Sequence, residues 1–114
     1  LIINMASYVI KKATIAASAT SSDAVDTDSL LLCGVIFPGT FQGTAITFKY
    51  STDGSTWMDV KETDGSAVSY TASDGDVVRA DPSGWAFASS GFLQIVSGST
   101  ESAQRIVHLI FRAS

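Results

Sequence analysis

The sequence has few charged residues and few side chains that could act as nucleophiles, bases or metal ligands. Only 16% of the 114 residues are Asp, Glu, Lys or Arg, against about 25% in an average soluble domain. There is one cysteine, Cys33, and one histidine, His108. Nucleophilic catalysis needs a base beside the nucleophile, and a zinc site needs three or four ligands. We therefore expect no enzyme activity, no catalytic residues and no bound cofactor.

The lone cysteine and histidine both lie in apolar surroundings. Cys33 cannot form an internal disulfide, so the sequence does not indicate whether the protein works in a reducing or an oxidising compartment. Its place in LLLCGVIF favours burial as a small hydrophobic residue. His108 lies between Val107 and Leu109, which favours a core or interface position.

The scattered bases and the lack of a long apolar run argue against nucleic-acid and membrane partners. The net charge of -4 comes from 11 acids and 7 bases, and only Lys11 and Lys12 are adjacent bases. A nucleic-acid binder usually concentrates Lys and Arg into a stripe, so no nucleic-acid partner is expected. No apolar run reaches the roughly 18 residues of a membrane span, and the start lacks the basic flank of a secretory signal.

Met5 is a more plausible natural start than Leu1, and the origin of Leu1–Asn4 stays open.

In place of charge, the chain carries many hydroxyl groups and apolar side chains. It has 17 Ser and 11 Thr, and hydrophobic residues make up 46%. A surface with few charges is less costly to strip of water. This composition favours a single domain, over residues 1–114, that is packed against something else.

Three Asp-Gly pairs predict an antiparallel all-β fold. They stand at Asp53-Gly54, Asp64-Gly65 and Asp74-Gly75, and Asp-Gly suits the tight turns of hairpins. We expect seven or eight antiparallel strands in a single β-sandwich, of jelly-roll or immunoglobulin-like order. The expected strands are 7–16, 29–37, 45–51, 56–61, 67–72, 76–80, 90–97 and 103–113, and the segment 17–28 is expected to be a loop.

Two of these strands are apolar on both faces. Strand 45–51 alternates apolar and polar residues, whereas 30–37 and 105–111 carry apolar residues on both sides. Such strands must be covered on both faces. The cover of the outer face is either the N-terminal arm (about residues 1–8), the loop 17–28 or a neighbouring subunit.

Two binding sites are worth testing. Asp74, Asp76 and Asp81 cluster within one short region, as calcium ligands do, although the spacing does not fit an EF-hand loop and we predict no metal site. Aromatic residues offer a stacking platform for glycans, with Tyr50, Trp57, Tyr70 and Trp85 as its members. Alternation directs Met58 and Val60 into the core and Trp57 outward, and a one-residue bulge would reverse this. The hairpin 43–60 is fully explained as scaffold.

Three segments resemble small β-rich virion proteins of tailed bacteriophages. They are GTAITFKYSTDGSTWMDV (43–60), DGDVVRADPSGWAF (74–87) and LQIVSGSTESAQRIVHLIFR (93–112). The resemblance spans roughly residues 30–113. It implies a capsid decoration or cement protein on the capsid exterior. Its partners would be the major capsid protein and copies of itself, with a homo-trimer as one arrangement. The alternative it implies is a glycan-binding tail, neck or fibre module.

If the chain clamps onto a shell, apolar and aromatic residues near its ends and loops are the candidate contacts. The expected shell contacts are Leu1, Ile2, Ile3, Tyr8, Phe37, Phe41, Trp85 and Phe87. The residues expected to stack on glycans in the alternative function are Tyr50, Trp57 and Tyr70.

Overall fold

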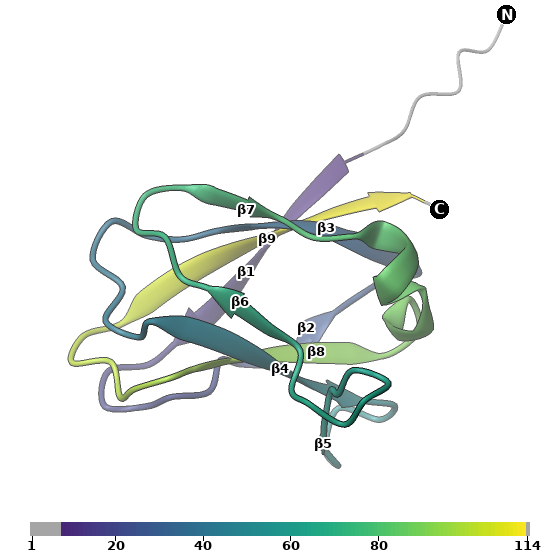
Figure 1. The fold of residues 1–114 in the computed structure, drawn as a ribbon, viewed down its shortest axis with the longest axis horizontal. Helices are drawn as coiled ribbons and strands as arrows, with labels where there is room; N and C mark the ends of the chain where they lie inside the picture. Colours follow the sequence, from purple (N-terminus) through teal and green to yellow (C-terminus); the bar gives the residue numbers. More distant parts are fainter. Residues whose placement is uncertain (1–7, 114) are drawn as a thin grey trace, which may run out of the picture.

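A computed structural model of the protein describes residues 8–113 as two antiparallel β-sheets packed face to face (Figure 1). Sheet A has the strand order β1-β9-β3-β7, and sheet B has the order β2-β8-β4-β5, with β6 also paired to β4. The strands are β1 (Tyr8–Ile15), β2 (Val25–Asp26), β3 (Leu30–Ile36), β4 (Ala45–Ser51), β5 (Met58–Asp59), β6 (Ser69–Thr71), β7 (Val77–Arg79), β8 (Phe92–Ser97) and β9 (Arg105–Ala113). A 3-10 helix, η1 (Pro82–Ala88), lies between β7 and β8.

The pairing of the strands is that of a jelly roll. The first strand pairs with the last, β2 with β8, β3 with β7 and β4 with β6. This is one long antiparallel ribbon wrapped around a core, and the wrap is closed where β9 pairs with β3 and β8 with β4. The predicted all-β sandwich is confirmed, and of the two topologies expected, this order is the jelly roll.

Local sequence accounts for most of the elements, although most of the predicted strands extend one or two residues beyond the observed ones. The expected strand 45–51 coincides with β4, and the glycine of each Asp-Gly turn has a positive φ of 75 to 89°, which suits glycine because it has no Cβ. Two elements differ from expectation. The predicted loop 17–28 contains the short strand β2, and residues 82–88 form η1, because Asp81 caps it through a bond from Ser83 N and Pro82 begins it.

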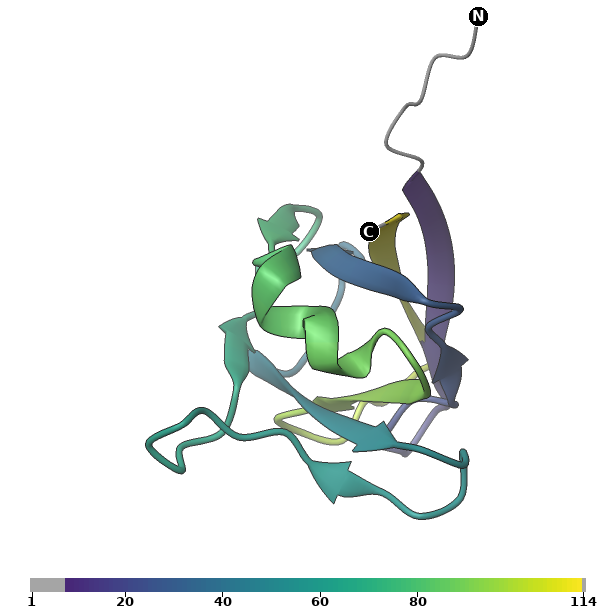
Figure 2. The same ribbon diagram turned by 90° about the vertical axis from the view of Figure 1, so that its right-hand side faces the viewer.

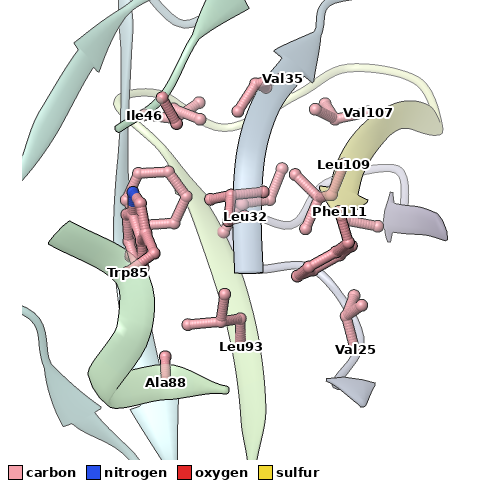
Figure 3. Packing of buried hydrophobic residues seen from close by; sticks show 14 of the residues in the cluster. Val25, Leu32, Val35, Ile46, Trp85, Ala88, Leu93, Val107, Leu109 and Phe111 are labelled. Atoms are coloured by element: carbon pink, nitrogen blue, oxygen red, sulfur yellow. The ribbon is translucent and has the colours of Figure 1, made fainter. Parts of the chain in front are cut away.

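The core lies between the sheets and is closed at one end by η1. Figure 3 shows side chains from both sheets and from η1 pointing into this shared interior, and Figure 2 shows η1 crossing the end of the sandwich. Phe48 of β4 packs edge-on against Trp85 of η1, with ring centroids 4.6 Å apart. Burying each such large side chain stabilises the fold by roughly 1.5–3 kcal/mol.

Candidate functional site

The outward face of sheet A is apolar on all four of its strands. Residues such as Leu32, Val35 and Leu109 point into the core, so their neighbours along each strand point outward. The strand register aligns these outward positions in rows: Ile10 lies beside Ile110, and Ile36 lies between His108 and Val77. We call this surface the apolar face, and its hydrophobic members are Tyr8, Ile10, Leu31, Ile36, Val77, Ile106 and Ile110.

Nothing among residues 8–113 covers the apolar face. Tyr8, Ile10 and Val77 are 63%, 58% and 57% exposed, and the other members are half-buried. The segment 17–28 does not lie over it, since Ser21 and Ser22 bridge to Val96 and Ile15 where the chain passes from sheet A to sheet B. The interpretation that this segment shields the outer face is therefore wrong. The N-terminal arm, except Tyr8, lies outside the described residues.

A shallow groove of about 660 Å³ runs through this face. Its lining includes Tyr8, Cys33, Val77 and Ile110. The groove is deepened at Gly34, because a Cβ there would lie 3.2 Å from Ile110 Cδ1. Cys33 lines the groove and is half-buried rather than fully buried as expected. Burial raises the pKa of its thiol, and nearby Arg112 offsets part of the rise.

The charges at the outward strand positions of the apolar face are all of one sign, although Asp81, which precedes η1, also lines the groove. Lys12, Arg79 and Arg112 take outward positions on β1, β7 and β9, together with His108. Among the outward positions of these four strands, as described over residues 8–113, there is no Asp or Glu. Because the whole chain carries a net charge of -4, this basic and apolar face contrasts with the rest of the molecule. It is suited to an apolar partner surface with acidic residues around it.

Three of the predicted contact residues belong to the core instead. Phe37, Phe41 and Trp85 are only 2%, 5% and 4% exposed. Phe37 and Phe41 pack edge-on against each other, with ring centroids 5.4 Å apart. They are therefore unavailable to a partner, and their role is structural. Phe87 is 54% exposed and Tyr8 lies on the apolar face, so both can contact a partner, whereas Leu1, Ile2 and Ile3 lie outside the described residues.

Of the predicted glycan platform, Tyr50, Tyr70 and Trp85 are linked by ring contacts that run through Phe87, whereas Trp57 stands apart. Tyr70 Oη accepts a hydrogen bond of 2.7 Å from Trp85 Nε1, and Tyr50 Oη donates to the carbonyl of Ser90. Trp57 is half-buried in the connection from β4 to β5, and within residues 8–113 it makes none of the ring contacts that link the other aromatic residues. Met58 was expected to point into the core, but it is 49% exposed because β5 is only two residues long and lies at the sheet edge.

A buried carboxylate that the sequence did not single out ties the loops at one end of the sandwich together. The Glu101 side chain is fully buried, and its oxygens accept hydrogen bonds from Gln42 N, Gly43 N, Ser97 Oγ and Arg105 Nε at 2.8 to 3.0 Å. Burial alone raises the pKa of this carboxyl, but these hydrogen bonds outweigh it and hold the pKa below its usual range. All four donors come from within the fold, so Glu101 connects the segments that carry them.

No protein-family model, curated protein or solved structure matches this chain.

Within the described part of the chain, the candidate calcium ligands Asp74, Asp76 and Asp81 do not form a metal-binding cluster. Asp81 caps η1 by accepting from Ser83, and Asp76 accepts from Ser73 Oγ at 2.6 Å. Over residues 8–113, no three His, Cys, Asp or Glu side chains come close enough together to hold a metal ion. The same part of the chain has no helix that is both long and apolar enough to cross a membrane.

Proposed function

We propose that this chain is a structural protein that stabilises an assembly by burying its apolar face against neighbouring subunits. The observation that carries the proposal is the four-stranded apolar face of sheet A, which residues 8–113 leave uncovered. Large exposed apolar surfaces on otherwise soluble folds mark interaction sites. The low charge content and the many hydroxyl groups lower the cost of removing water from the surface around it.

The assembly we propose is a virion shell, with the chain acting as a capsid decoration or cement protein. Two features support this assembly over others. The segments 43–60, 74–87 and 93–112 resemble phage virion proteins, and the jelly-roll order is common among viral structural domains, although lectins use it too. The partners would be the major capsid protein and neighbouring copies of this chain on the capsid exterior.

The mechanism is energetic and requires no chemical step. Each copy buries apolar area that contributes about 25 cal/mol per Å², and Lys12, Arg79 and Arg112 select an acidic surface around the contact. This free energy exists only while the shell is assembled, so binding shifts the equilibrium away from shell rupture.

The proposal is tested by adding purified protein to shells that lack it and measuring co-sedimentation. Ile10→Glu places a carboxylate on the apolar face and is expected to weaken binding at least about tenfold, since it desolvates a charge and repels an acidic partner. Met58→Glu is the matched control, because Met58 is similarly exposed but lies on β5 of sheet B, and it should bind as wild type.

Both variants are expected to melt at the wild-type temperature, because neither side chain belongs to the core. If Ile10→Glu binds as tightly as wild type, the apolar face is not the contact surface. If the wild-type protein does not bind the shell, the decoration function is wrong.

A further inference from the structure

A second groove is lined by aromatic rings and charged groups, and it adjoins the groove of the apolar face, since Arg79 and Asp81 line both. It lies between η1 and the segment 60–68 that connects β5 to β6, and its volume is about 520 Å³. Small-molecule sites typically measure about 300–1,000 Å³. Phe87, Trp85 and Tyr70 line it, together with Glu62, Arg79 and Asp81. The shell-binding role uses Arg79 but none of the aromatic rings of this groove.

Phe87 is an exposed ring held in one orientation. Its side chain is 54% exposed, although it packs against two other rings. Trp85 stacks on it with centroids 5.8 Å apart and an interplanar angle of 25°, and Tyr50 meets it edge-on at 5.6 Å. Contacts on two sides fix the ring and leave its remaining surface open to solvent. A fixed, exposed aromatic ring suits a ligand that has a flat apolar side.

The polar groups of the groove are free to bind a ligand. Within residues 8–113, the side chains of Glu62 and Arg79 make no hydrogen bond or ion pair with the protein. Tyr70 Oη accepts from Trp85 Nε1, and over the same residues its own proton has no acceptor. The groove therefore offers an unused acceptor, an unused multiple donor and an unused phenol proton around one aromatic ring.

The formal charges that line the groove cancel. Lys61 and Arg79 contribute two positive charges, and Glu62 and Asp81 contribute two negative charges. This balance disfavours strongly charged ligands. A purely apolar peptide is also disfavoured, because it would bury Glu62 and Arg79 without hydrogen-bond partners. A neutral ligand with both an apolar face and many hydroxyl groups satisfies all of these groups.

We propose that this groove binds a neutral saccharide, with the C–H face of a sugar ring against Phe87. The sugar hydroxyls would accept from Arg79 and Tyr70 and donate to Glu62. This site shares Tyr70 and Trp85 with the predicted platform, but Phe87 supplies its exposed aromatic surface and Trp57 takes no part in it.

The test uses neutral hexoses, N-acetylhexosamines and their disaccharides as probes, with saturation-transfer NMR and tryptophan fluorescence as readouts. At least one probe is expected to bind with millimolar affinity and to receive saturation at its ring C–H protons. Phe87→Ala is expected to weaken this binding about tenfold, and Phe87→Trp should restore it. Met58→Ala, an exposed apolar residue outside the groove, is the control and should bind as wild type.

The proposal is overturned if no probe binds, or if Phe87→Ala binds the same probe as tightly as wild type. Near-ultraviolet circular dichroism confirms that each variant keeps its packed core. Ile10→Glu, whose site lies outside this groove, should bind the probe as wild type does, so a failure of the saccharide site is distinguishable from a failure of the decoration function.

Discussion

Gly91 is a residue at which the backbone tolerates little change. It joins η1 to β8 with a φ of 128°, a conformation that L side chains rarely adopt. A Cβ built there would lie 2.6 Å from the carbonyl oxygen of Ser51 and 2.8 Å from Tyr50 Oη. Its own carbonyl accepts from both Thr27 N and Thr27 Oγ1 at 3.1 Å. The residue is thus locked between β4 and the turn before β3.

Gly91→Ala is expected to lower the free energy of unfolding by about 3 kcal/mol, because backbone strain adds to a contact with backbone atoms that cannot move aside. Gly65→Ala is the matched control. Its φ is also positive, at 89°, but nothing lies within 4 Å of the added Cβ, so about 1 kcal/mol is expected. Urea unfolding curves measure both, and equal losses would contradict the packing around Gly91.

Among the elements, one end of the sandwich depends on a single carboxylate. Glu101 lies in the connection from β8 to β9, and it binds the backbone of Gln42 and Gly43 in the connection from β3 to β4. Its own backbone accepts from Ser18 N and donates to Ala19 O in the connection from β1 to β2. Three connections between strands are therefore fixed by one residue, and Arg105 balances its charge at 2.9 Å.

Glu101→Gln is expected to cost about 3 kcal/mol at neutral pH, because it removes a buried charge and leaves Arg105 without its partner. The pKa of Glu101 is lower in the folded protein than its ordinary value of 4.5. Its contribution is therefore fully present above pH 4.5 and is lost as the pH falls through the folded-state pKa.

The stability difference between wild type and Glu101→Gln should accordingly shrink as the solution is acidified below pH 4.5. Urea unfolding over a pH series measures it. The pKa of Asp53 is lowered to about 2 by hydrogen bonds from Thr56 N, Ser55 N and Ser51. Because Asp53 is present in both proteins, its contribution to the pH dependence cancels in the difference. A difference that stays constant with pH would show that the carboxylate charge does not hold the loops.

Strands were predictable where a local pattern determined them. The alternation of residues 45–51 and the Asp-Gly turns depend on near neighbours, and both agree with the structure. β2 and η1 were missed because β2 is only two residues long and is defined by pairing with β8, while η1 depends on the Asp81 cap. Glu101 was missed because its donors lie up to 59 residues away in the chain.

At the scale of the whole molecule, the sequence pointed to the type of interaction surface but not to its residues. Strands with two apolar faces indicated an outer surface that needs a cover, and the structure leaves that surface open over residues 8–113. Which residues share it depends on the register of β1, β9, β3 and β7, which is set by long-range pairing. The same pairing placed Phe37, Phe41 and Trp85 in the core, where their exposure could not be judged from local sequence.

The choice between jelly roll and immunoglobulin-like order was also beyond local reasoning. Both topologies use short antiparallel strands with similar turns, and they differ only in which distant strands pair. The pairing of β1 with β9 and of β2 with β8 decides it.

In the proposed role, this chain stabilises a virion shell across its whole lattice. The most direct test is its copy number in purified virions, measured by quantitative mass spectrometry against the major shell protein. We expect near-stoichiometric abundance, because each junction of the shell would bind a copy through the apolar face. A handful of copies per particle would contradict the lattice-wide role and favour a tail or neck location, and complete absence would contradict the virion assignment itself.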